Sequence, residues 1–306
     1  MMARNHAGCK TADRLSATAR IALFGVIAGC TSPPNQRQFL VEDVRILAIS
    51  VEPAEVQPGQ TVTLQAFVAG PTGEPLDQRT TWSVCLAPKA PSEDNAVAPS
   101  CLGADVTPIG AGTAQHVVTA TVPSDACARF GPDSPPGDFR PRAADGTGGY
   151  YQPFRVDAAP INRTAIGLVR IQCNLPLAPP EVAQAYRTQY QANAAPQFTL
   201  QVPSRIAANA SIELTAMWPA TEQQTYLWFD AATIALVPRR ESMRVNWFVT
   251  AGDLPVDASL VQEASTATSS SVTWQAPSEA GTTTIWAVLR DSRGGMSVQQ
   301  ATVLVE

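Results

Sequence analysis

Residues 56–68 read VQPGQTVTLQAFV, and this stretch decides the fold class. A Pro-Gly turn is followed by a run in which every second residue is apolar, namely Val62, Leu64, Ala66 and Val68. Such alternation predicts a β-strand that turns one face toward a core. Residues 206–218, IAANASIELTAMW, repeat the pattern 150 positions further along. The chain is therefore predicted to contain two copies of one β unit.

Two more matches follow in the same order in both copies. The next predicted strand carries a tryptophan with a valine two residues away, at Trp82 in the first copy and Trp247 in the second. Further on, residues 118–126 read VTATVPSDA and residues 272–280 read VTWQAPSEA. Three matches in one order indicate duplication of a single unit.

The composition fits an all-β protein. The 306 residues include 26 prolines and 19 glycines, which suits many short strands joined by turns. Residues 282–289 and 297–305 alternate around the turn at 291–295, which is a hairpin pattern. Hydrophobic residues make up 45% of the chain, enough for substantial cores, and the net charge of −5 provides no basic field for nucleic acid.

The two units resemble bacterial immunoglobulin-like and PKD-type β-sandwiches. The resemblance rests on the Pro-Gly-Gln turn, the tryptophan of the third strand and the terminal hairpin turn VLRDSRGG at 288–295. It concerns architecture, because neither second strand carries the cysteine of antibody domains. We expect one sandwich with long loops over residues 44–177 and another over 198–306, joined by a helical linker at 178–197.

The linker contains one short helix by its pattern. Pro180 suits the first turn and Glu181 suits the positive end of the helix dipole. Val182, Tyr186 and Tyr190 recur at helical spacing, so they share one face. We expect this face to pack on a sandwich.

The N-terminus has the form of an export signal. Residues 1–29 carry four basic residues and end in an apolar run at 21–29, which is too short to span a bilayer as a helix. Residues 27–30, IAGC, resemble the bacterial lipobox, which implies cleavage before Cys30 and attachment of acyl chains, palmitate among them, to that cysteine. Thr31 in place of Asp implies sorting to the outer membrane, on its periplasmic or cell-surface face. The alternative is an ordinary signal peptide with Cys30 as a structural cysteine.

Cleavage at this position would leave 17 basic and 25 acidic residues, a net charge of −8. An acidic surface disfavours contact with anionic headgroups, so the acyl chains would be the membrane contact. Residues 30–43 are rich in polar and turn-forming residues, and we interpret them as a lipidated flexible tether.

Four cysteines remain beyond Cys30, which is typical of an oxidising compartment. Two disulfides have three connectivities, of which we favour Cys85–Cys101 with Cys127–Cys173. A zinc site is the competing interpretation, but the chain has no C-x2-C spacing and one histidine, His116, outside the signal.

No pattern of a known catalytic or cofactor site occurs in the sequence. The G-x-S-x-G, H-E-x-x-H, Walker and G-x-G-x-x-G motifs are all missing, so we predict no enzyme, no cofactor and no metal. His116 is expected to lie on a strand with a structural role. Glu222, Asp230 and Glu241 are expected on the solvated surface, and Asp291 is expected to form a turn rather than bind calcium.

Five of the six tryptophans lie in the second unit. Four of these are predicted on core faces, at Trp218, Trp247, Trp274 and Trp286. Trp228 is the exception, within the sequence YLWFD at 226–230. Core packing is the favoured interpretation for it. The alternative is a ligand platform of Tyr226, Trp228 and Asp230, which could stack on a sugar or lie in a protein interface.

These observations favour a non-enzymatic, lipid-anchored envelope protein that acts as a structural or protein-interaction module. The alternative is a carbohydrate-binding module for wall or extracellular glycan. The expected partners are the membrane, through Cys30, and an envelope protein or glycan.

The lipobox interpretation predicts the mass of the mature protein. Protein isolated from the native envelope should begin at Cys30 and carry excess mass equal to its acyl chains. A Cys30→Ala variant should lose this mass and its membrane association. Intact mass spectrometry with membrane fractionation is the measurement, and an unmodified N-terminus elsewhere would contradict lipidation.

Overall fold

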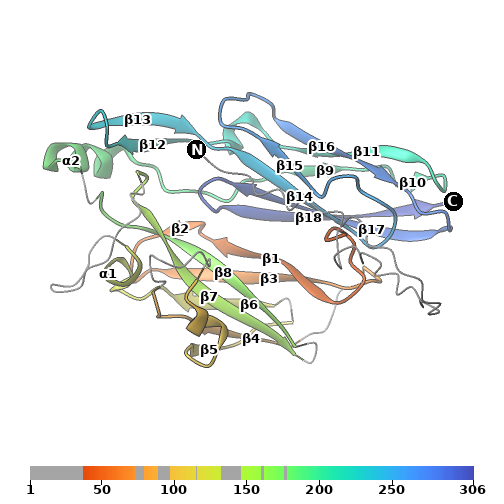
Figure 1. Cartoon of the computed structure of the whole chain (residues 1–306), viewed down its shortest axis with the longest axis horizontal. Coiled ribbons are helices and arrows are strands. Elements are labelled where there is room, and N and C mark those ends of the chain that lie inside the picture. Colours follow the sequence, from red (N-terminus) through yellow and green to blue (C-terminus); the bar gives the residue numbers. More distant parts are fainter. Residues whose placement is uncertain are drawn as a thin grey trace, which may run out of the picture. The chain divides into compact units, whose positions relative to one another are not determined.

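The computed structural model describes residues 37–73, 79–88, 97–114, 116–131, 146–159, 162–175 and 178–306 (Figure 1). The signal and Cys30 lie outside these ranges. The fold is all-β with several sheets and short helices, as the alternating patterns predict. None of the helices in the described ranges is long and apolar enough to cross a membrane.

The first sandwich packs a three-stranded sheet, in the order β1-β3-β6, against a five-stranded sheet, in the order β2-β8-β7-β4-β5. Its strands are β1 (Arg45–Glu52), β2 (Glu55–Val56), β3 (Thr61–Ala69), β4 (Arg79–Val84), β5 (Thr107–Ala111), β6 (Val117–Thr121), β7 (Gly149–Ala159) and β8 (Arg163–Gln172). The alternating residues Val62, Leu64 and Ala66 of β3 are buried in its core. Trp82 of β4 packs in the same core from the opposite sheet.

The second sandwich repeats this topology, with sheets β16-β11-β9 and β10-β18-β17-β14-β15. Its strands are β9 (Thr199–Gln201), β10 (Arg205–Ile206), β11 (Ser211–Met217), β14 (Met243–Val249), β15 (Ala258–Val261), β16 (Ser269–Gln275), β17 (Gly281–Asp291) and β18 (Met296–Val305). In both sandwiches a two-residue strand, β2 or β10, pairs in parallel with the last strand. These two short strands lie 150 positions apart, the offset of the sequence repeat.

Two disulfides reinforce the first sandwich, in the pairing that we favoured. Cys85–Cys101 joins the chain after β4 to the short 3-10 helix η1 (Pro99–Leu102). Cys127–Cys173 joins α1 (Ala126–Phe130) to the chain after β8.

The linker contains α2 (Pro180–Gln189), as its helical spacing predicts. Tyr186 is buried, with Val182 and Tyr190 half-buried beside it. Their partners include Phe229 and Leu236 of an additional hairpin, β12 (Thr225–Asp230) and β13 (Ala235–Arg240). A 3-10 helix, η2 (Ala220–Glu222), precedes this hairpin. The helix therefore packs on an insertion of the second unit.

An apolar contact joins the sandwiches to each other. Trp286 of β17 packs with Leu47 of β1 and Ala69 of β3, so β17 is buried on both of its faces. We predicted Trp286 in the core of its own sandwich, and this is wrong. Ile285 and Ala287 fill that core instead, because alternate residues of a strand point to opposite faces. Trp218, Trp247 and Trp274 lie in the core as predicted.

Residues 37–43 differ from our expectation of a flexible tether. Phe39 is 4% exposed and Val41 is fully buried. The Val249 N–H donates to the Phe39 carbonyl at 2.9 Å, and the Val41 N–H donates to the Val249 carbonyl at 2.8 Å. Backbone pairing with the end of β14 places Phe39 in the core of the second sandwich and Val41 in the apolar contact around Trp286. Residues 37–43 are therefore part of the folded structure, and our prediction of a tether over them is wrong.

Replacing Phe39 should therefore lower the stability of the whole fold. Phe39→Ala removes a buried ring and is expected to cost about 3–5 kcal/mol of unfolding free energy. The neighbouring exposed Gln38→Ala should change it by less than about 0.5 kcal/mol. Urea denaturation of both variants measures the free energy of unfolding. Equal midpoints for the two variants would contradict the burial of Phe39 and would support a flexible tether over residues 37–43.

Candidate functional site

A network of buried charged and polar side chains connects the two sandwiches and the linker. Its members are Glu55 and Arg170 of the first sandwich, Tyr190 and Asn193 after α2, and Glu241, Asp291 and Arg293 of the second unit. We call this set the buried charge network. Apart from Tyr190, which is half-buried, each member is at most 7% exposed.

Glu55 is the acceptor at the first-sandwich end of the network. Its Oε2 lies 3.3 Å from Arg170 Nε and accepts hydrogen bonds from the Tyr190 hydroxyl and the Asn193 N–H, both at 2.8 Å. The short strand β2 holds Glu55 beside Arg170, because Glu55 and Arg170 are partners in the parallel ladder of β2 and β8. One carboxylate thus joins the first sandwich to the linker.

Arg293 is the donor at the second-unit end. Its Nε donates to Glu241 at 2.7 Å, one Nη donates to the Tyr190 hydroxyl at 3.0 Å, and the other donates to Gln224 at 2.7 Å. Its Nη1 also lies 3.9 Å from the Glu55 carboxylate. A single guanidinium therefore contacts groups from the first sandwich, the linker and the second unit.

The network has three carboxylates and two guanidinium groups, which is one negative charge in excess when all are ionised. Burial and the neighbouring Asp291 carboxylate raise the pKa of Glu241 to about 7, against the opposing effect of Arg293. Burial also raises the pKa of Asp291. Taking up one proton balances the charge of the buried groups.

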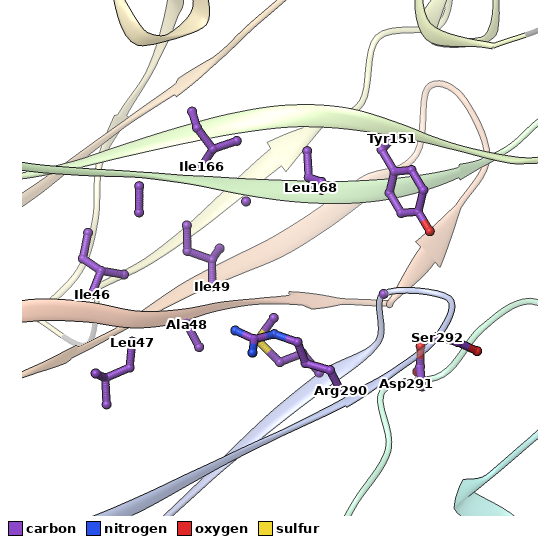
Figure 2. A pocket seen from close by; sticks show the side chains of 14 residues that line it. Ile46, Leu47, Ala48, Ile49, Tyr151, Ile166, Leu168, Arg290, Asp291 and Ser292 are labelled. Atoms are coloured by element: carbon purple, nitrogen blue, oxygen red, sulfur yellow. The ribbon is translucent and has the colours of Figure 1, made fainter. Parts of the chain in front are cut away.

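A groove opens beside this network, between the first sandwich and the β17–β18 turn (Figure 2). Its volume is about 440 Å³. Its residues come from β1, β7, β8 and the second sandwich: Ile46, Leu47, Ala48, Ile49, Tyr151, Ala165, Ile166, Gly167, Leu168, Arg290, Asp291, Ser292, Gly294 and Met296. Because Asp291 belongs to both, the buried charge network forms one end of the groove.

A β-bulge in β1 shapes the wall of the groove. Leu47 has no partner in β3, since Ile46 pairs with Val68 and Ala48 with Phe67. The extra residue interrupts the alternation of side chains. As Figure 2 shows, Ile46 and Ile49 point toward β8, whereas Leu47 and Ala48 point to the other side, toward β17 and its turn. Four consecutive apolar residues can thus line one groove, and their unbroken run was the only sequence signal for it.

The predicted ligand platform lies elsewhere, on β12. The guanidinium of Arg239 lies 4.7 Å from the ring centroid of Trp228, and Gly146 approaches the same indole closely. Tyr226 is buried, with Arg293 4.9 Å from its ring centroid. Asp230 accepts hydrogen bonds from residues of the turn after β12. Protein groups therefore contact the aromatic faces that a sugar would use.

The structure also places three residues for which we made single predictions. Glu241 and His116 lie elsewhere than predicted, and Asp291 has the predicted role. Glu241 is fully buried in the network, although we predicted a solvated surface. His116 is buried and immediately precedes β6 in a left-handed turn conformation, with φ of 59°. Asp291 accepts the N–H groups of Arg293 and Gly295, which is the turn role we predicted. Within the described ranges, no group of three or more His, Cys, Asp or Glu residues is arranged for metal binding.

Comparisons with known proteins identify no family. No family model matches the chain, and no curated protein matches it. Among solved structures, 87% of the chain aligns with 22% of the α2-macroglobulin of Escherichia coli activated by porcine elastase, at 14% identity and a TM-score of 0.22. A second alignment covers 85% of the chain and 60% of the adhesin InvE of Yersinia pseudotuberculosis, at 10% identity and a TM-score of 0.24. Similarity at this level carries no information about function.

The charge imbalance predicts a dependence of stability on pH. The pKa of Glu241 is raised from 4.5 to about 7 in the folded protein, so folding takes up a proton between these values. The free energy of unfolding should therefore fall as pH rises from about 4.5 to 7, by roughly 3 kcal/mol. Glu241→Gln should flatten this slope, whereas the exposed Glu213→Gln should retain it. The measurement is urea denaturation at several pH values between 4.5 and 7. If Glu241→Gln left the pH dependence of the unfolding free energy unchanged, Glu241 would not be its source.

Proposed function

We propose that this chain is a non-enzymatic, lipid-anchored protein of the bacterial outer membrane that binds a partner protein through the groove between its sandwiches. The observation that carries the proposal is the groove itself, which has aliphatic side chains of β1 and β8 on one side and polar groups of the β17–β18 turn on the other, beside a joint that contains buried charges. A preformed channel does not have to be ordered on binding, which lowers the entropic cost of association. Anchoring through Cys30 would hold this channel at a membrane surface.

The groove suits a protein partner better than a glycan. Its side chains are chiefly aliphatic, with Ile46, Ile49 and Ile166 among them and Leu168 exposed at 37%. Sugar sites rely on open aromatic faces and many polar groups. The aromatic segment on β12 offers Trp228, but Arg239 and Gly146 contact its ring. The glycan-binding alternative therefore has less support than a protein interface.

Photo-crosslinking in the native host tests this function. A photoreactive amino acid at Leu168 should give covalent adducts with a specific protein after irradiation of intact cells. The matched control is Leu260, which is more exposed, at 57%, and does not line the groove. Equal adducts at both positions, or adducts with glycan alone at position 168, would overturn the proposal.

A further inference from the structure

We infer that the partner enters the groove as an extended peptide strand, which adds to the free edge of β8 and places a carboxylate on Arg290. This inference rests on the proposed function and specifies the chemistry of the partner. It is carried by three features of the groove: an open sheet edge, apolar side chains along the wall formed by β1 and β8, and a cation that has no acidic partner among the residues that the structure describes.

The open edge follows from the pairing of β8. In the five-stranded sheet, β8 lies between β7 and β2, but β2 pairs only with Arg170 and Ile171. Among the residues that the structure describes, residues 163–169 of β8 therefore have a ladder partner on the β7 side alone. An unpaired edge presents N–H and C=O groups that can pair with another strand.

The register shows which backbone groups face outward. Cys173 donates its N–H to Gly148, the residue before β7, so the two share a hydrogen-bonded pair of the antiparallel ladder. Such pairs alternate along a ladder, so every second residue of β8 directs its N–H and C=O away from β7. By this count Arg170, one of the two β8 residues that pair with β2, directs its backbone groups outward. By the same count the outward groups are those of Thr164, Ile166 and Leu168, and the last two line the groove.

The cation comes from the second sandwich. Arg290 of β17 lies directly opposite Arg244 of β14, a cross-strand pair of like charges. Within the ranges that the structure describes, neither guanidinium has a carboxylate within 4.0 Å, and Arg290 donates instead to the neutral Asn246 amide at 2.8 Å. Burial and, second, the charge of Arg244 lower the pKa of Arg290. A carboxylate at this position would offset both effects, because an opposite charge favours the charged form of the guanidinium.

These features together select one class of ligand. The apolar wall favours apolar side chains, the free edge favours a peptide backbone, and Arg290 favours an acidic side chain or a chain terminus. A lipid or a small anion would meet only one or two of these conditions. An extended apolar segment with one carboxylate meets all three.

Selection of peptides from a displayed random library on the purified protein is the test. The selected peptides should alternate apolar residues and share one acidic position. Arg290→Gln should weaken an acidic peptide about tenfold, and Arg290→Lys should restore part of that loss. A version of the peptide in which the acidic side chain is replaced by its amide should bind the wild-type protein and Arg290→Gln equally.

Two further measurements test the strand itself. Ile166→Pro removes an outward N–H and spares the ladder to β7, so it should abolish binding, whereas Ile166→Ala keeps that N–H and should retain most of it. Methylation of alternate peptide nitrogens should weaken binding, whereas methylation of the intervening ones should not. Equal binding by both Ile166 variants, no effect of methylation, or no selected peptide would overturn the inference. Crosslinking at Leu168 that nevertheless succeeds would leave the proposed function standing.

Discussion

The contact between Arg293 and its partners holds the two sandwiches in one arrangement. Its side chain is 2% exposed, and the guanidinium binds groups on the linker and the second unit, with Glu55 of the first sandwich 3.9 Å away. A charge buried this deeply is stable only when its partners are in place, because an unpaired buried charge costs several kcal/mol. Moving one sandwich away from the other would separate Arg293 from Glu55 and the linker groups that it contacts.

The groove is a consequence of this joint. Its first wall is the edge of the first sandwich, where β1 and β8 approach one another, and its second wall is the end of the β17–β18 hairpin. Neither sandwich contains the groove alone. The apolar contact of Trp286 with Leu47 closes the interface on one side, and the Asp291 turn borders the groove on the other. A feature of this kind is suited to recognition because it exists before a partner arrives.

The duplicated units share a topology and differ in their additions. Both keep the same strand order and a buried tryptophan on corresponding strands, Trp82 and Trp247. Only the first carries disulfides within the described ranges, and only the second carries the inserted β12–β13 hairpin on which α2 packs. The inserted hairpin ends at Arg240, and the next residue, Glu241, supplies one of the carboxylates that contact Arg293.

The sequence alone determined the all-β class, the duplication, the linker helix and the expectation of two disulfides, whose pairing the structure decided among three connectivities. Each depends on a local pattern: a period of two for strands, a helical spacing at Val182 and Tyr186, or a count of cysteines. The tertiary structure alone decided the roles of Glu241, Trp286 and Phe39. Their burial depends on partners far away in the chain, and no local pattern reveals whether a second sheet or a second charge covers a residue. The local sequence around Glu241 predicts a solvated side chain. Its burial follows only from the contact with Arg293, which lies 52 positions later in the chain.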